Sequence, residues 1–123
     1  MKTDSAVLIV SHGSRSSQAF AEFNQVVKLV SNRYQKSIVR GASMEINQPD
    51  IPTAIKELVE QGISQINVVP YFLFMGNHTK KDIPQIIENQ KIIYPQLNVR
   101  IAKPIGVSSL LADILIERAD ELV

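Results

Sequence analysis

The chain has 123 residues, of which 45% are hydrophobic and 20% are charged, and it carries a formal net charge of +1. This balance predicts one packed domain over residues 1–123 and excludes an extended, disordered chain. The near-neutral charge argues against whole-protein electrostatic binding to nucleic acid or to an anionic membrane. The absence of cysteine excludes disulfides, thiolate nucleophiles and cysteine-ligated zinc or iron–sulfur sites.

Sorting signals are absent from the sequence pattern. The longest nearly apolar run, residues 66–75, is far shorter than the roughly 20 residues that a membrane helix needs. The polar start of the chain leads into only five apolar residues before Ser11, which is too few for a signal peptide. We therefore expect a cytoplasmic protein with no membrane span.

The first half of the chain predicts two strands and two helices. Residues 6–10 form a continuous apolar run, typical of a strand buried on both faces of a parallel sheet. Residues 16–34 carry apolar side chains at three- and four-residue spacing, which predicts a helix, and residues 38–46 are expected to form the second strand. The tripeptide Asp50-Ile51-Pro52 predicts a helix start, and Gly62 predicts the end of that helix.

The second half repeats this alternation. Residues 66–74 are the most apolar strand and should be central, and residues 99–102 are expected to form the fourth strand. The tripeptide Asp82-Ile83-Pro84 repeats the helix-opening pattern, and Ser108 or Ser109 is expected to cap the last helix. The apolar stripes of these two helices are Ile83, Ile86, Ile87 and Ile93, and then Leu111, Leu115 and Leu122.

The order strand–helix, four times over, predicts an α/β fold with an open parallel four-stranded sheet and helices on both faces. In such sheets, ligands bind beyond the carboxyl ends of the strands, near the point where strand order reverses. The loops that should carry function are therefore residues 11–17, 45–50, 75–82 and 104–109.

Both histidines of the chain, His12 and His78, fall in these loops, after the first and third strands. Those two strands should be neighbours across the reversal point, so we expect the two imidazoles to face one crevice. Imidazole binds divalent metals and titrates near neutral pH. Glu45, at the end of the second strand, is either a metal ligand or proton acceptor at the same rim or a solvated strand end. Two imidazoles and a carboxylate leave open coordination positions, which suits a transient ion.

The same loops carry features that suit anions. Ser14 and Arg15 follow Gly13 just before a helix N-terminus, where free N–H groups favour carboxylate or phosphate. Lys80 and Lys81 offer further positive charge, although both also fit ordinary solvated surface. A dinucleotide-binding glycine pattern and a Walker lysine are missing, which disfavours a nucleotide site. Residues 71–75 are expected to lie mostly in the core, the alternative being that the last one or two wall a flat ligand.

Three segments together resemble the sirohydrochlorin chelatases, the class II, ATP-independent enzymes that insert cobalt, iron or nickel into sirohydrochlorin. These segments are Val-Ser-His-Gly-Ser-Arg at residues 10–15, Glu45 followed by Pro-Asp-Ile-Pro at residues 49–52, and residues 69–84, which include Gly-Asn-His-Thr-Lys-Lys-Asp-Ile-Pro. The resemblance covers nearly the whole chain. It implies a flavodoxin-like chelatase fold and, because larger members carry two such domains in tandem, a homodimer for this single-domain chain.

The resemblance also implies roles for individual residues. His12, His78 and Glu45 would be catalytic, His12 and His78 would hold the metal, and the substrate's carboxylates would meet Ser14, Arg15, Lys80 and Lys81. The divalent metal would be a substrate, with Co²⁺ favoured over Fe²⁺ and Ni²⁺, and no permanently bound cofactor is expected.

Three other functions compete with this hypothesis. A metal or tetrapyrrole carrier without catalysis would share every site residue. A histidine phosphotransfer enzyme would use His12, but that chemistry usually has arginine directly before the His-Gly pair, where this chain has Ser11. A detached half-domain that serves only in assembly would bind no metal.

Overall fold

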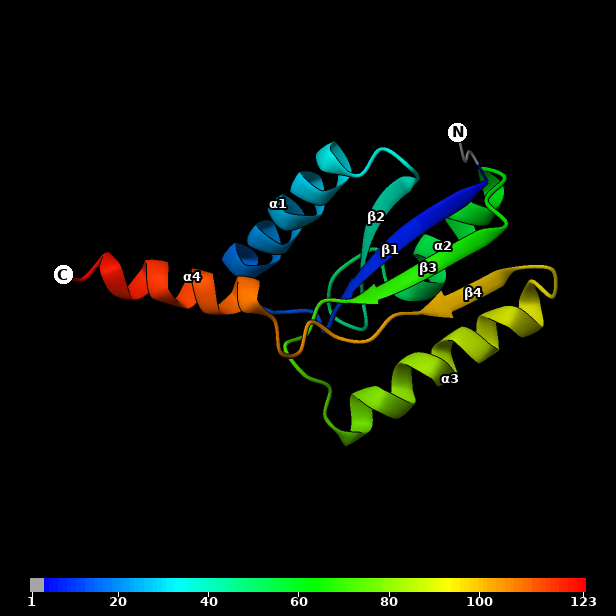
Figure 1. Ribbon diagram of the computed structural model, residues 1–123. Helices are drawn as coiled ribbons and strands as arrows, with labels where there is room; N and C mark the ends of the chain where they lie inside the picture. Colours follow the sequence, from blue (N-terminus) through cyan, green and yellow to red (C-terminus); the bar gives the residue numbers. More distant parts are fainter. Residues whose placement is uncertain (1–3) are drawn as a thin grey trace.

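The computed structural model describes residues 4–123, without the side chain of His78. In this part of the chain four strands alternate with four helices, as the sequence predicts (Figure 1). The sheet is parallel throughout, in the order β2-β1-β3-β4, so β1 and β3 are neighbours where the strand order reverses. The elements are β1 (Ser5–Ser11), α1 (Ser17–Arg33), β2 (Ile38–Ser43), α2 (Ile51–Glu60), β3 (Gln65–Pro70), α3 (Asn77–Ile93), β4 (Asn98–Ile101) and α4 (Ser109–Asp120).

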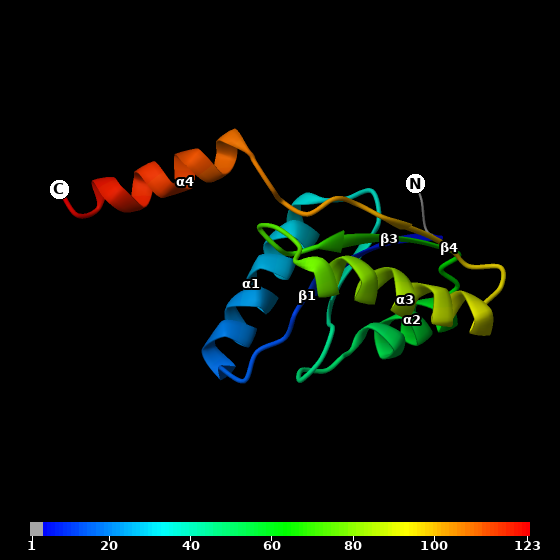
Figure 2. The same cartoon turned by 90° about the horizontal axis from the view of Figure 1, so that it is seen from below.

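Helices cover both faces of the sheet, because β1 is apolar on both sides. Alternate residues of a strand point to opposite faces. Ala6, Leu8 and Val10 pack against α2 and α3. Val7 and Ile9 pack against Phe23 of α1. Figure 2 shows α2 and α3 together on one side of the strands. The larger core cluster includes Ala6, Leu8, Val10, Ile51, Ile55, Leu58, Ile66, Val68, Ile83 and Ile87.

The first two helices begin at capping residues, of which Asp50 is the one that the sequence predicts. Ser16 Oγ accepts a hydrogen bond from the Ala19 amide at 3.1 Å, and Asp50 Oδ1 accepts one from the Thr53 amide at 2.9 Å. Hydrogen bonds from the side chain and the backbone of Thr53 lower the pKa of the Asp50 carboxyl, because they stabilise its charged form. The α2 helix ends at Glu60, and Gly62 follows with a φ of +92°, a conformation that favours glycine.

The prediction that the third strand reaches residue 74 is wrong. The β3 strand ends at Pro70, whose partner on β1 is Val10, while its pairing with β4 already ends at Val68. The apolar residues that follow enter a loop. Phe72 and Met75 pack against the core, whereas Tyr71, Leu73 and Phe74 are exposed. The expectation that residues 71–75 lie mostly in the core is therefore wrong, because three of the five belong to an exposed loop beyond the strand.

The second Asp-Ile-Pro tripeptide does not open a helix. Helix α3 already begins at Asn77, so Pro84 lies inside it and His78 lies in its first turn rather than in a loop. Gly76 precedes the helix and offers no capping side chain, so no sequence signal marks the true start. Of the predicted stripe, Ile83 and Ile87 are buried and Ile86 packs against the core, but Ile93 at the helix end is exposed.

The second strand is also shorter than predicted, since β2 ends at Ser43 rather than at residue 46. Ile46 has a φ of +73°, which a strand cannot accommodate. Helix α4 is capped by Ser108, as expected, but it contains no buried residue, and its predicted apolar stripe meets no core of the same chain. Within residues 4–123, no helix is both long and apolar enough to span a membrane.

Candidate functional site

A histidine and a glutamate meet at the carboxyl edge of the sheet. His12 follows β1 directly and Glu45 follows β2 by two residues, so the parallel pairing of the two strands brings them to the same rim. Nε2 of His12 lies 3.2 Å from Oε1 of Glu45, and both side chains are more than half exposed. An imidazole held against a carboxylate and open to solvent can bind a metal ion or accept a proton.

Backbone hydrogen bonds fix this pair beyond the end of the sheet. The Met44 amide donates to the Ser11 carbonyl at 2.9 Å, and the Glu45 amide donates to the His12 carbonyl at 3.3 Å. On the other side, the Tyr71 amide donates to the Val10 carbonyl at 2.7 Å. The end of β1 and His12 just after it are therefore joined to the segments that follow both neighbouring strands.

Asn47 ties the same two loops together through its side chain. Its Oδ1 accepts from the Ser14 amide at 2.8 Å, and its Nδ2 donates to the Ser14 carbonyl at 3.1 Å. The sequence analysis missed this residue, because an asparagine in a loop after a strand is typical of an ordinary turn. The only available signal was its position two residues after Glu45.

Gly13 lets the two loops approach closely. Its φ is +104°, and a Cβ built on it would lie 2.0 Å from the carbonyl oxygen of Glu45. A side chain at this position would therefore clash with backbone as well as strain the chain. The glycine of the His-Gly-Ser segment places His12 against the Glu45 loop.

A hollow of about 240 Å³ opens beside the His12–Glu45 pair. It lies between the loops and helix α3, and it is lined by His12, Met44, Glu45, Asp82, Gln85 and Ile86. Asp82 was expected to cap a helix, but it adds a second carboxylate to this hollow. The hollow is smaller than the roughly 300–1,000 Å³ that encloses a typical small-molecule ligand. A large flat ligand would therefore lie across it rather than inside it.

A smaller hollow of about 140 Å³ lies on the other side of His12. Phe20, Phe23 and Tyr71 contribute to its lining, and the rings of Phe23 and Tyr71 have centroids 5.6 Å apart. An apolar wall was considered for the last residues of the 71–75 run. The first residue of that run lines this hollow, while Phe74 is 80% exposed.

The remaining candidates are spread around this edge. Ser14 is half-buried and its Oγ accepts from the Ser16 amide at 3.0 Å, so its hydroxyl shapes the loop. Arg15, Lys80 and Lys81 are exposed. His78 lies in the first turn of α3, four residues before Asp82 and therefore one helical turn from it. Among the side chains that the structure describes, no three acidic, histidine or cysteine groups gather closely enough to hold a metal ion.

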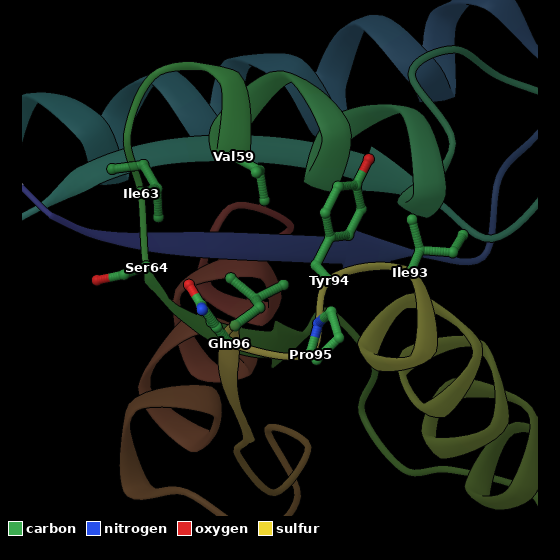
Figure 3. Close-up of a pocket in the computed structure, with 8 residues that line it drawn as sticks. Val59, Ile63, Ser64, Ile93, Tyr94, Pro95 and Gln96 are labelled. Carbon is green, nitrogen blue, oxygen red and sulfur yellow. The ribbon is translucent and has the colours of Figure 1, made fainter.

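A larger hollow, of about 370 Å³, lies at the opposite end of the sheet (Figure 3). It is formed where α2 and α3 end, and its lining has no charged side chain: Val59, Ile63, Ser64, Ile93, Tyr94, Pro95, Gln96 and Leu97. Its lining contains no histidine, carboxylate or cysteine that could bind a metal ion. The candidate metal ligands and bases of the described residues, His12, Glu45 and Asp82, lie at the carboxyl edge of the sheet.

Comparisons with known proteins identify the family of the chain. The CbiX family model matches residues 6–122. The sirohydrochlorin cobaltochelatase of Sulfurisphaera tokodaii is 37% identical over 119 residues, which cover 95% of this chain and 92% of that protein. The sirohydrochlorin ferrochelatase of Priestia megaterium is 33% identical over 116 residues, which cover 94% of this chain but 44% of that protein.

A solved structure has the same fold. The sirohydrochlorin chelatase SirB from Bacillus subtilis subspecies spizizenii, crystallised in complex with cobalt, superposes with a TM-score of 0.90 at 28% sequence identity. The match covers 96% of this chain and 50% of that chain. This chain thus spans nearly the full length of one relative and about half the length of others. From the family model and these relatives, the chain belongs to the CbiX family.

Proposed function

We propose that this protein inserts a divalent metal ion into sirohydrochlorin without ATP, and that residues 1–123 act as one chelatase domain. The observation that carries the proposal is the His12–Glu45 pair, with Nε2 and Oε1 3.2 Å apart at the open carboxyl edge of the sheet. The relatives named above divide between cobaltochelatases and ferrochelatases. Co²⁺ is our first choice of substrate, followed by Fe²⁺ and Ni²⁺.

The reaction requires a base as well as a metal ligand. When the ion binds the ring nitrogens, both N–H protons of the ring must leave, so the products are the metallated ring and two protons. A carboxylate oxygen beside Nε2 favours the imidazole tautomer that carries its proton on that nitrogen, which leaves a free lone pair on Nδ1. Nδ1 of His12 can then bind the ion or accept a ring proton, while Glu45 stabilises the resulting imidazolium.

His78 is proposed as the second metal ligand. It lies one turn before Asp82, and Asp82 lines the hollow shared with His12 and Glu45. Helix α3 therefore lines the hollow with residues of its second and third turns. Two imidazoles with one or two nearby carboxylates give a weak, open coordination sphere, which suits an ion that must be passed on to the ring.

The carboxylate-rich rim of the substrate needs positive charge and N–H donors. Ser14 and Arg15 lie just before the N-terminus of α1, and Lys80 and Lys81 lie near the N-terminus of α3. The N-terminus of a helix favours anions, because its first amide N–H groups have no partner within the helix. We propose these four residues as peripheral contacts of the substrate.

A homodimer is part of the proposal. The hollow at His12, with a volume of about 240 Å³, is too small to enclose a tetrapyrrole. The matched SirB chain is about twice as long as this one. A second copy would supply the area that the second half of the longer relatives supplies.

The test is an initial-rate comparison of sirohydrochlorin metallation with Co²⁺, Fe²⁺ and Ni²⁺, followed by the absorbance change of the ring and measured against protein-free controls. His12→Ala should slow the reaction by about 100-fold or more, the usual contribution of a positioned proton acceptor. Gln18→Ala, an exposed residue of α1, is the matched control and should keep the wild-type rate. A wild-type rate no higher than the protein-free rate, together with stoichiometric metal or tetrapyrrole binding, would instead identify a carrier.

A further inference from the structure

Ile46, the residue after Glu45, holds a backbone conformation that isoleucine rarely adopts. Its φ is +73°, the one positive φ outside glycine within residues 4–123. The Asn47 amide donates a hydrogen bond to the Glu45 carbonyl at 2.8 Å, so Ile46 is the central residue of a γ-turn. A γ-turn with a positive φ is the rarer and more strained of the two forms, and a β-branched residue is an outlier there.

Packing in the core does not explain why isoleucine occupies this turn. The side chain of Ile46 is 55% exposed, and it belongs to neither of the two buried clusters within residues 4–123. Glycine would adopt the same φ without steric strain, and asparagine would adopt it with less. The chain therefore keeps an apolar side chain in a strained turn without burying it. Strain of this kind is concentrated at functional sites.

Ile46 lies between the two hollows that flank His12. Glu45, just before it, lines the hollow of about 240 Å³, and Asn47, just after it, lines the hollow of about 140 Å³. His12 belongs to the lining of both. Ile46 is thus at the border of the surface across which a large flat ligand would lie.

The residues on both sides of Ile46 are held by the loop after β1. The Glu45 amide donates to the His12 carbonyl at 3.3 Å, and the side chain of Asn47 forms hydrogen bonds of 2.8 and 3.1 Å with the backbone of Ser14. The turn is therefore fixed at this border before any ligand binds. A contact made by a side chain on a fixed turn costs little additional ordering.

We propose that Ile46 is a substrate-contacting residue, whose apolar side chain packs against the tetrapyrrole ring itself. This inference rests on the proposed function for the identity of the ligand. The peripheral contacts proposed above, Ser14, Arg15, Lys80 and Lys81, meet the carboxylates of the substrate and leave its ring without an apolar partner. Ile46 supplies that partner, and burial of its exposed surface under the ring offsets the strain of the turn. It takes no part in metal binding or proton transfer.

The first experiment measures the dissociation constant of metal-free sirohydrochlorin, by titrating the ring with the full chain and following its absorbance. Ile46→Asn tolerates the positive φ but removes the apolar surface, so it should raise the dissociation constant by about 10-fold. Ile46→Gly should weaken binding similarly, whereas Ile46→Leu should bind nearly as the wild type does. The matched control is Leu29→Asn on α1, where the leucine is 51% exposed, and it should not change the constant. Unchanged binding in both Ile46→Asn and Ile46→Gly would overturn the proposal.

The second experiment separates substrate contact from support of Glu45. In Ile46→Asn the KM for sirohydrochlorin should rise by the same factor as the dissociation constant, while kcat stays at the wild-type value. A lower kcat with an unchanged KM would contradict the proposal, because the turn would then serve only to hold Glu45.

Two further measurements keep this inference apart from other accounts. Light scattering should give the same mass for the wild type and Ile46→Asn, and a smaller mass for the variant would overturn the proposal by showing that Ile46 contacts another copy. A wild type that binds sirohydrochlorin without metallating it would refute only the proposed function. Metallation by the wild type, with unchanged substrate affinity in the two Ile46 variants, would refute only the contact at Ile46.

Discussion

The loops at the carboxyl edge of the sheet and helix α4 differ in how many contacts they make with the rest of the chain. The loops that carry His12 and Glu45 are joined by backbone hydrogen bonds, by both polar atoms of the Asn47 amide and by the close contact at Gly13. Helix α4, which leaves from the same edge, buries no residue in its own copy. The difference shows that contacts within one chain fix the His12–Glu45 pair, whereas helix α4 has no buried packing in that chain. Changes at the contacts that join these loops should therefore have the largest effect where backbone meets backbone, at Gly13.

Gly13→Ala should be the most damaging change. The new Cβ would meet the Glu45 carbonyl, and the left-handed backbone would be strained, so the free energy of unfolding should fall by at least about 3 kcal/mol in urea titrations. Gly62→Ala is the matched control, since Gly62 also has a positive φ but has open space around it. It should cost only about 1 kcal/mol. Equal losses in the two variants would mean that the loops are not in close contact.

Asn47→Ala should come next. It removes both hydrogen bonds to Ser14, which should lower the free energy of unfolding by about 2 kcal/mol and the metallation rate by about 10–100-fold, because His12 would lose its fixed position. Asn47→Asp keeps the acceptor for the Ser14 amide and should fall between the wild type and the alanine variant. The exposed Asn24→Ala serves as control. An unchanged metallation rate in Asn47→Ala would show that the Asn47 amide does not position His12 for the reaction.

Asp50 ends the Glu45 loop and caps α2, so it links the loop to the core. Asp50→Ala should lower the free energy of unfolding by about 1 kcal/mol at neutral pH. The folded state lowers the pKa of this carboxyl, so its contribution is present above the unfolded pKa of about 3.9 and is lost as the pH falls below it. Urea titrations of both proteins from pH 7 downward should therefore converge under acid. A constant difference across that range would contradict the assignment.

The smallest effect concerns Ile46, which holds a left-handed backbone inside the same loop. Ile46→Gly should raise the free energy of unfolding, by up to about 1 kcal/mol, because relief of the strain exceeds the entropy lost by glycine. Ile46→Val keeps the strain and should leave thermal unfolding nearly unchanged. Destabilisation by Ile46→Gly would mean that contacts of the isoleucine side chain outweigh the backbone strain.

The fold was predictable because its signals are local. The apolar run of residues 6–10 can be buried on both faces only at the centre of a parallel sheet, and Asp50 with Pro52 marks a true helix start. The same rules failed at Asp82, where the tripeptide lies inside a helix that begins without a capping side chain at Gly76. They also failed for residues 71–74, since an apolar run does not reveal where its neighbouring strands end.

The part of the site that lies directly at the ends of neighbouring strands was predictable from the order of the strands. Parallel strands that end at one edge bring His12 beside Glu45, so their proximity follows from topology. The contributions of Asn47 and Asp82 depend on side-chain contacts between segments far apart in the chain, and an asparagine or aspartate in a loop has many local roles. The sequence did not predict that α4 buries no residue, because its apolar stripe is also typical of a helix that packs on its own sheet.

The central claim is that His12 and His78 act on one and the same metal ion. The most direct test is a double-mutant cycle on the initial rate of Co²⁺ insertion into sirohydrochlorin, with His12→Ala, His78→Ala and the double variant. If the two histidines share an ion, each single variant should be slow and the double variant should be little slower than the slower single one. If the two losses multiply in the double variant, the histidines act independently and the account is wrong.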